Sequence, residues 1–279
     1  SDLCSSDLEV LMKSYLEWGY NCLDHLTGAY AFALYDVVKK ELFLARDRAG
    51  EKPLYYNHTR DRFVFSSELK ALMADPSLPR ILNLDALDYY LTYGYVSGDQ
   101  SILKNTHKLL PGHAMVFCTE KNCINSWRYW ELPENMCQSR VSMEDLTDEL
   151  ETILTSSVRR QLVADVPVGI LLSGGLDSSL ITAIAARVSD QPIKTFTISF
   201  PEHSPFNEGP YAKLVADYFS TNHTELVAEP FSLSLLPQLA RQYDEPLADH
   251  SLVPCSILTD LVSKSVKVAL GGDGGDELF

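Results

Sequence analysis

Two glycine-rich segments in the second half of the chain carry residue types that could bind a nucleotide. The first, Ser173–Ser179, reads SGGLDSS and lies between an apolar run and a helical pattern. A loop of this kind points backbone N–H groups and a helix N-terminus at one spot, where a phosphate can bind. The loop has no lysine, so it is not the common G-x-x-x-x-G-K-S/T phosphate loop of NTPases. A simple Gly-Gly connection is the alternative, but it would not explain the serines and Asp177.

The second segment, Gly271–Glu277, reads GGDGGDE and follows an apolar strand pattern directly. Ligands of open parallel sheets bind beyond the carboxyl ends of the strands, so both segments are expected to face one crevice. Asp177 beside a phosphate would be repelled unless a divalent cation bridged the two groups, which makes Asp177 and Asp276 candidate Mg²⁺ ligands. Asp273 could orient or deprotonate a nucleophile. A solvated loop without chemistry is the alternative.

The elements around these motifs alternate between strand and helix patterns, which predicts a parallel sheet with helices on its faces. A helix with apolar positions from Leu146 to Leu162 precedes them, and Ser142 and Asp145 form its S-x-x-D start signal. The elements expected after it are strand Val168–Leu172, helix Asp177–Val188, strand Thr195–Phe200, helix Tyr211–Phe219, helical stretches Leu233–Ala240 and Ile257–Ser263, and strand Val266–Leu270.

The first half reads as a strand-rich domain, separated from the second by a polar linker at about Glu131–Ser142. Ser6 and Asp7 occupy the N-cap position of a helix whose apolar residues run from Leu8 to Leu16. The other elements expected are a hairpin of Ala29–Asp36 and Glu41–Asp47, strand Arg62–Phe65, helices Glu68–Met73 and Leu84–Leu91, and strand Ala114–Cys118.

Composition excludes several classes of protein. The 279 residues are 46% hydrophobic and 22% charged, as in ordinary folded domains. A net charge of −15 repels nucleic-acid phosphates, so no nucleic-acid partner is expected. Apolar stretches are too short to cross a bilayer and no signal segment opens the chain, which predicts a cytoplasmic protein without a membrane partner. The six cysteines show no CxxC spacing and are expected to be reduced thiols.

At these motifs the chain resembles a known family. SGGLDSS and GGDGGDELF resemble the synthetase domain of glutamine-dependent asparagine synthetases, which are pyrophosphate-loop ATPases. The first half is similar to the later part of that family's glutaminase domain, in the segments SDLEV (6–10), LDHLTGAYAFALYD (23–36), ARDR (45–48), KPLYY (52–56) and FSSELK (65–70). The resemblance implies an α/β fold, in which a partial N-terminal-nucleophile-type α/β/β/α sandwich at 1–135 precedes a parallel-sheet ATP-pyrophosphatase domain at 140–279.

The resemblance also implies roles for individual residues. Asp7 would bind the α-amino group of glutamine, a role compatible with capping a helix. Asp177 and Asp276 would bind Mg²⁺. Asp273 would help ammonia attack, although some family members have the longer Glu there. The residues expected to bind ATP are Leu172 and Ile198 beside the adenosine, Ser173, Gly174, Gly175, Asp177, Ser178 and Ser179 around the pyrophosphate, and Gly271 and Gly272 opposite them.

A further segment, Tyr243–Pro246 with Asp249 and Ser251, resembles a region near the acceptor pocket, or it could be a capped turn. The implied reaction converts aspartate, glutamine and ATP to asparagine, glutamate, AMP and pyrophosphate, with small-molecule substrates and, as a family expectation, a homodimer. Two alternatives stay open, namely a related enzyme that amidates another carboxylate, such as a sugar uronate, or forms a lactam, and a non-catalytic nucleotide-binding chain.

The family's glutaminase nucleophile is an N-terminal cysteine followed by glycine, and the sequence shown here has none. Cys4 is internal and is followed by Ser5, so it has no free α-amino group to act as a base. The family's Asn-Gly oxyanion motif is also absent. The sequence therefore predicts an internal fragment that is inactive as a glutaminase by itself.

Overall fold

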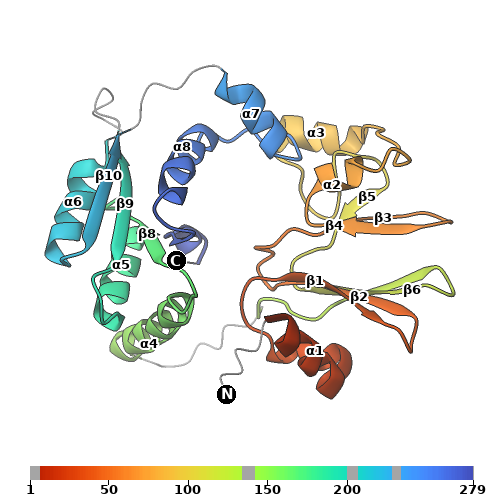
Figure 1. The fold of residues 1–279 in the computed structure, drawn as a ribbon, viewed down its shortest axis with the longest axis horizontal. Helices are drawn as coiled ribbons and strands as arrows, with labels where there is room; N and C mark the ends of the chain where they lie inside the picture. Colours follow the sequence, from red (N-terminus) through yellow and green to blue (C-terminus); the bar gives the residue numbers. More distant parts are fainter. Residues whose placement is uncertain (1–6, 134–141, 200–206, 228–233, 279) are drawn as a thin grey trace. The chain divides into compact units, whose positions relative to one another are not determined.

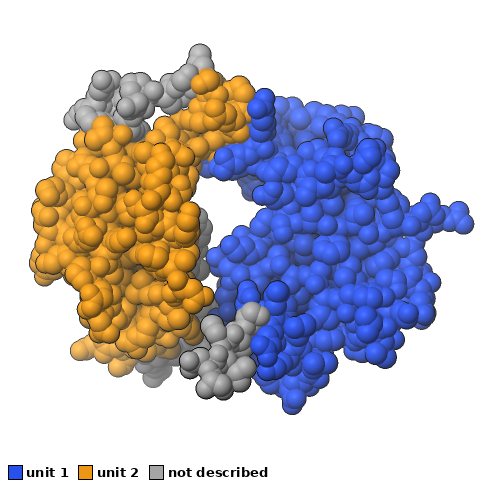
Figure 2. Space-filling model, in the orientation of Figure 1, with its two compact units in different colours: residues 1–136, 240–249 blue, residues 137–239, 250–279 orange. Residues whose placement is uncertain are grey.

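The structure is a computed structural model that describes residues 7–133, 142–199, 207–227 and 234–278. The chain divides into two compact units (Figure 2). Unit 1 contains Ser1–Met136 together with the distant segment Ala240–Asp249, and unit 2 contains Cys137–Leu239 and His250–Phe279. Each unit has its own sheets and its own hydrophobic cores.

Unit 1 is built from two antiparallel sheets and short helices (Figure 1). One sheet has the order β1-β2-β6-β7 and the other the order β4-β3-β5. The elements are α1 (Asp7–Trp18), the 3-10 helix η1 (Gly19–His25), β1 (Ala31–Asp36), β2 (Glu41–Arg46), β3 (Tyr55–His58), β4 (Phe63–Ser66), α2 (Leu69–Met73), α3 (Leu84–Tyr93), β5 (Thr106–Lys108), β6 (His113–Cys118) and β7 (Cys123–Arg128).

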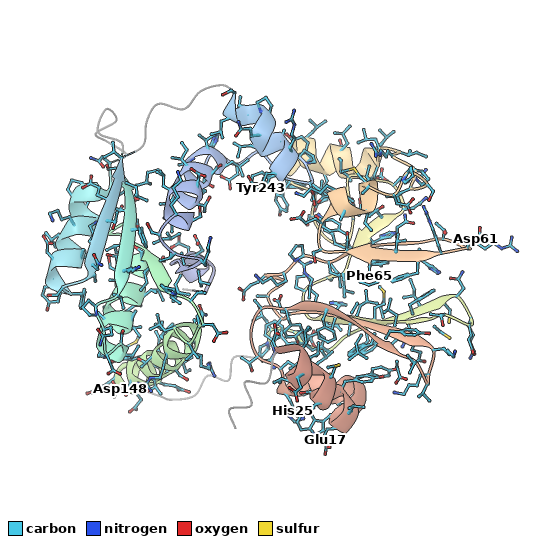
Figure 3. The ribbon with its side chains drawn as sticks, viewed as in Figure 1. Glu17, His25, Asp61, Phe65, Asp148 and Tyr243 are labelled. Atoms are coloured by element: carbon cyan, nitrogen blue, oxygen red, sulfur yellow. The ribbon has the colours of Figure 1, made fainter. Side chains whose placement is uncertain are left out.

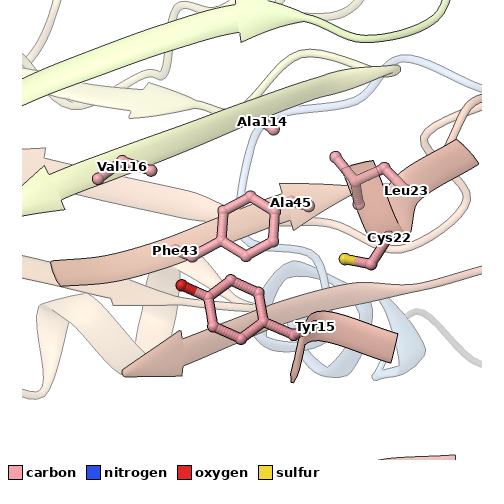
Figure 4. Packing of buried hydrophobic residues seen from close by; sticks show 7 residues of the cluster. All are labelled: Tyr15, Cys22, Leu23, Phe43, Ala45, Ala114 and Val116. Carbon is pink, nitrogen blue, oxygen red and sulfur yellow. The ribbon is translucent and has the colours of Figure 1, made fainter. Parts of the chain in front are cut away.

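The side chains of β2 alternate between two cores and so define the layers of unit 1. Phe43 and Ala45 pack with residues of α1, η1 and β6 (Figure 4). Leu42 and Leu44 point to the opposite face, where they pack against residues of β3 and β4. A third core, which includes Tyr55 of β3, covers the far face of the second sheet with residues of α2. Because successive strand residues face opposite sides, this order of cores gives the α/β/β/α layering.

The hairpin predicted in the first half is confirmed. Strands β1 and β2 pair antiparallel from Ala31 with Arg46 to Asp36 with Glu41, and Lys40 in the turn has φ of 58°. Three strands of unit 1, β3, β5 and β7, were not predicted from the sequence, nor was η1. Strand β5 is three residues long, and β7 is exposed at four of its six positions, so neither carries a clear apolar alternation.

A buried aspartate organises the loop that follows β2. Asp47 is 1% exposed, and its carboxylate accepts hydrogen bonds from the backbone N–H groups of Tyr30 (3.2 Å), Glu51 (2.9 Å) and Lys52 (3.0 Å). Its own carbonyl oxygen accepts from the N–H of Gly112 at 2.9 Å. One buried side chain thus satisfies three backbone donors and fixes the conformation of the loop.

We expect Asp47→Ala to lower the free energy of unfolding of unit 1 by about 3 kcal/mol, because it removes the acceptor for three backbone donors at once. All three tryptophans of the chain, Trp18, Trp127 and Trp130, lie in unit 1. Tryptophan fluorescence during urea denaturation therefore reports this unit. Asp61→Ala is the matched control, because Asp61 is exposed at the tip of the β3–β4 hairpin (Figure 3). Equal midpoints for the two variants would contradict the role given to Asp47.

Unit 2 contains a parallel sheet of order β10-β9-β8-β11. The strands are β8 (Val168–Leu171), β9 (Lys194–Ser199), β10 (Asn222–Val227) and β11 (Val268–Leu270). The helices are α4 (Met143–Gln161), α5 (Leu176–Val188), α6 (Gly209–Tyr218), α7 (Leu235–Gln242, whose last residues belong to unit 1), α8 (Leu252–Ser263) and α9 (Gly275–Leu278). The prediction of a parallel sheet flanked by helices is confirmed.

Alternation along β8 again separates the two faces of the sheet. Ile170 packs on one face with residues of α4 and α5, and Leu172, on the same side, packs against α6. Leu171 packs on the other face, with Phe196 and residues of α8. At the start of α4, the Ser142 hydroxyl oxygen accepts from the N–H of Asp145 at 3.1 Å, so the start signal is confirmed.

Strand β10 was not predicted, because its sequence NHTELV has only two apolar residues. The predicted linker falls mostly on residues 134–141, outside the described residues. Among the residues that the structure describes, no helix is long and apolar enough to cross a membrane.

Candidate nucleotide-binding site

The two glycine-rich segments meet at the carboxyl ends of the adjacent strands β8 and β11. Leu270 at the end of β11 pairs with Ile170 of β8, so the loops that follow both strands begin side by side. Both loops line one cleft of about 490 Å³ in unit 2. The prediction that they face a single crevice is therefore confirmed, and the location agrees with the general position of ligands in open parallel sheets.

The first loop is held in shape by its own serines. Ser173 and Ser178 share a hydrogen bond between their hydroxyl oxygens, 2.8 Å apart. The Ser178 hydroxyl oxygen accepts from the N–H of Ser173 at 3.2 Å, and the Ser173 hydroxyl oxygen accepts from the N–H of Gly175 at 3.2 Å. Gly175 is the N-cap of α5 and supplies no side chain to cap it. The first N–H groups of α5 can therefore bind an anion.

Glycine allows the second loop to approach the first. A Cβ atom on Gly272 would lie 2.8 Å from the backbone nitrogen of Ser178. A Cβ atom on Gly275 would lie 2.6–2.9 Å from the carboxyl group of Asp177. The Asp177 carboxylate therefore lies against the second loop, next to the residue that precedes Asp276.

The charge of the cleft bears on which ligand it can accept. Asp177, Glu208, Asp273 and Asp276 line it, and no lysine or arginine of the described residues does. A polyphosphate alone would be repelled by these carboxylates, whereas a divalent cation between carboxylates and phosphates would neutralise both. Among the described residues, no group of three or more His, Cys, Asp and Glu side chains forms a complete metal site. This donor set fits Mg²⁺, which commonly takes one or two protein carboxylates and completes its shell with phosphate oxygens and water.

The structure places most of the predicted nucleotide residues on this cleft and leaves out two. Gly174 and Ser179 are not among the lining residues. Gly174 faces α6, where a Cβ atom would lie 2.6 Å from the Cβ atom of Tyr211. Ser179 lies within α5, where its N–H donates to the carbonyl of Gly175 at 3.0 Å. The predicted residues that line the cleft are Leu172, Ser173, Gly175, Asp177, Ser178, Ile198, Gly271, Gly272, Asp273 and Asp276.

Several residues that line the cleft were not predicted from the sequence. Cys255 and Leu258 lie three positions apart on α8, so they share a helix face, and the apolar periodicity around them was the available signal. Glu208, just before α6, had no motif to mark it. Leu171, Leu176, Phe196, Thr197, Gly274 and Gly275 also line the cleft.

The residue expected to bind glutamine lies in unit 1. Asp7 is the exposed first residue of α1, and its carboxylate accepts from the N–H of Leu8 at 2.9 Å. This contact is to the adjacent residue and is not an N-cap hydrogen bond, although a carboxylate in the first turn is favourable at a helix start. Binding of glutamine stays a prediction. Ser6 and Cys4 lie outside the described residues.

Of the segment that resembles an acceptor region, Tyr243–Pro246 and Asp249 also belong to unit 1, whereas Ser251 belongs to unit 2. The carboxylates of Asp244 and Glu245 pair there with Lys70 and Lys108. Neither carboxylate is therefore a simple surface group of a capped turn.

Comparison with known families gives a match to each half of the chain. Residues 3–130 match the glutamine amidotransferase domain family, and residues 149–279 match the asparagine synthase family. The order of the two matches is the order expected from the sequence motifs.

Curated relatives match over nearly the whole chain. A protein of Methanocaldococcus jannaschii, provisionally named asparagine synthetase (glutamine-hydrolyzing) 2, is 36% identical over 98% of this chain and 53% of its own length. Asparagine synthetase (glutamine-hydrolyzing) 3 of Bacillus subtilis is 35% identical over 99% of this chain and 47% of its own length. Amidase chry2 of Gibberella zeae is 27% identical over 99% of this chain and 43% of its own length. The chain thus spans about half the length of the curated relatives it matches.

Similarity to solved structures is weak. The NH3-dependent NAD synthetase of Campylobacter jejuni gives a TM-score of 0.34 at 16% identity, covering 47% of this chain and 58% of that one. The glutamine-dependent NAD+ synthetase of Acinetobacter baumannii, solved with ADP, gives a TM-score of 0.37 at 11% identity, covering 99% of this chain and 66% of that one. At these scores the similarity carries no argument about function.

Proposed function

Because this chain belongs to the family that joins a glutamine amidotransferase domain to an asparagine synthase domain, we propose that it is part of a glutamine-hydrolysing asparagine synthetase. Residues 1–135 would form the amidotransferase domain and 140–279 the synthetase domain. The observation that carries the proposal is the cleft of unit 2, where the SGGLDSS loop and the GGDGGD loop face each other beside several carboxylates. A homodimer stays a prediction from the resemblance, and a cytoplasmic location stays a prediction from the composition.

In the first step, an oxygen of the acceptor β-carboxylate would attack the α-phosphorus of ATP and release pyrophosphate. The N–H groups at the start of α5 and the Ser173–Ser178 pair would hold the departing phosphates. Asp177 and Asp276 would hold Mg²⁺, which, when bound, neutralises charge that develops on the phosphate oxygens. Leu172 and Ile198 would lie along the adenosine.

In the second step, ammonia released from glutamine would attack the acyl carbon of the β-aspartyl-AMP intermediate, and AMP would leave. Asp273 is exposed in the cleft, where its carboxylate can accept a proton from the attacking ammonia. Its side chain is one methylene shorter than the Glu of some family members, so the acceptor would need to lie correspondingly closer. Asp7 would bind the α-amino group of glutamine in the other unit.

A second candidate function is amidation of another carboxylate by the same chemistry. The observation that favours it is the match to a fungal protein named an amidase, which covers 99% of this chain. The shorter Asp273 also leaves room for a different acceptor.

The test is pyrophosphate release by the intact protein with ATP, Mg²⁺ and ammonium, in the presence of aspartate, a sugar uronate or no acceptor. We expect pyrophosphate and asparagine in equal amounts with aspartate, and background release otherwise. Background release with aspartate but stimulation by the uronate would reject the asparagine assignment in favour of the second candidate. If no acceptor stimulates release, binding of ATP to unit 2 would distinguish a nucleotide-binding chain from an unrelated function.

A further inference from the structure

The segment Ala240–Asp249 belongs to unit 1, although the residues on both sides of it belong to unit 2 (Figure 2). Beyond the end of α7 at Gln242, it contains no helix or strand. Its conformation therefore depends on its contacts with the rest of unit 1. Tyr243, which follows α7, marks the point where this stretch begins (Figure 3).

The main contact is a largely buried ion pair between Glu245 and Lys108 at the end of β5. The two side chains are 11% and 16% exposed, and their charged atoms lie 2.5 Å apart. The second Glu245 oxygen accepts from the N–H of Ile102 at 2.8 Å. Lys108 also donates to the carbonyl of Val96 at 2.8 Å. Burial and the nearby Glu245 carboxylate raise the pKa of Tyr55 on the adjacent strand β3.

Further contacts hold the segment on both sides of this pair. Lys70 of α2 donates to the carbonyl of Gln242 at 2.8 Å and lies 3.3 Å from the carboxylate of Asp244, which is 10% exposed. The N–H of Ala248 donates to the carbonyl of Gly94 at 2.8 Å. The contacts thus extend from one end of the segment almost to the other. Removing Lys108 would leave the Glu245 carboxylate largely buried without its counter-charge, so this pair restrains the segment more strongly than the more exposed Lys70–Asp244 pair.

The segment leads directly into the nucleotide cleft of unit 2. Helix α8 starts at Leu252, three residues after Asp249, so about 11 Å of chain at most separates the held segment from the helix. Cys255 and Leu258 of this helix line the cleft. Only His250 and Ser251, which form a turn, join the held segment to the first turn of α8, so the two are close neighbours along the chain.

We propose that Lys108 and Lys70, which lie in the amidotransferase part of the sequence, are positioning residues for the synthetase reaction. They hold the segment Ala240–Asp249, and through it they hold the first turn of α8 at the nucleotide cleft. This inference rests on the proposed function for its activity readout. Its structural readout, the protection of α8, does not.

The test compares Lys108→Met with wild type in the intact protein, by two readouts. One is ammonia-dependent pyrophosphate release with aspartate, which needs no glutamine chemistry. We expect kcat/KM for aspartate to fall about tenfold, because a small displacement of a binding wall has effects of this size. Glutamine hydrolysis without ATP should be unchanged. The other readout is hydrogen exchange, which should rise over residues 252–258 and stay unchanged over α5.

Matched variants separate positioning from a general loss of stability. Lys108→Arg keeps the charge and should retain most of the activity, and Lys104→Met removes an exposed lysine from the same region and should match wild type. Lys70→Met, which changes a more exposed lysine, provides a second test if Lys108→Met fails to fold.

The proposal would be overturned if the folded lysine variants showed the same hydrogen exchange of α8 and the same kcat/KM for aspartate as wild type. An equal loss of glutamine hydrolysis and pyrophosphate release would also overturn it. If wild type releases no pyrophosphate with aspartate, the proposed function fails, and hydrogen exchange of α8 alone decides this inference.

Discussion

Asp177→Asn is expected to lower pyrophosphate release by about a thousandfold, which corresponds to about 4 kcal/mol of transition-state stabilisation. The substitution keeps the size of the side chain and removes the charge that would hold Mg²⁺ against the phosphates. Its carboxyl group touches the position of Gly275, so a larger residue would not test the charge alone. Pyrophosphate release measured over a range of Mg²⁺ concentrations should show a reduced maximum and a higher Mg²⁺ requirement.

The control for this experiment is Asp190→Asn, which removes an exposed carboxylate just beyond the other end of α5. It changes the net charge by the same amount and should leave pyrophosphate release at the wild-type level. Glutamine hydrolysis should be unaffected in both variants. If Asp177→Asn retained wild-type release at every Mg²⁺ concentration, the cation would have to be held without this carboxylate.

Gly174→Ala is expected to destabilise unit 2 by about 3 kcal/mol or more and to abolish ATP binding with it. Gly174 has φ of +81°, a conformation that is unfavourable for alanine. The added Cβ atom would also lie 2.7 Å from the backbone nitrogen of Ala212, which cannot move without shifting α6. Hydrogen exchange of α5 and α6, together with binding of a fluorescent ATP analogue, would measure both effects.

Gly274→Ala separates backbone strain from the steric clash. Gly274 has φ of +91°, close to that of Gly174, but a Cβ atom there would meet none of the described residues within 4 Å. We expect Gly274→Ala to lower the free energy of unfolding of unit 2 by only about 1 kcal/mol, which is the strain of the left-handed conformation. If Gly174→Ala and Gly274→Ala lowered the free energy of unfolding equally, the contact of Gly174 with α6 would have no role in stability.

The sequence was sufficient to predict the elements of unit 2 that surround the cleft. Their apolar residues have a regular spacing, and parallel order follows from alternating strands and helices. Strand β10 was missed because it is an edge strand of the sheet, where most side chains stay exposed and few apolar residues are needed. The joint location of the two loops followed from general geometry, since loops after neighbouring parallel strands lie on the same edge.

Contacts between distant residues were beyond the reach of sequence patterns. The role of Gly174 in a phosphate cradle stays a prediction, but its close packing against α6 could not be predicted, because only the position of that helix decides it. The same limit applies to the segment Ala240–Asp249. Its pairing with Lys108 joins residues more than a hundred positions apart, and no local pattern signals that a stretch of one half packs on the other.

The alternation of β2 between two cores has a consequence for how the chain can evolve. Phe43 and Leu44 pack in different cores. A deletion or insertion of one residue in β2 would therefore turn the side chains that follow it to the opposite face and disrupt both cores at once. Single substitutions disturb one layer only and can be compensated by a neighbour. Changes in length are therefore confined to the turn before β2, where Val37 and Val38 are exposed, and lineages can diverge in the composition of β2 but hardly in its length.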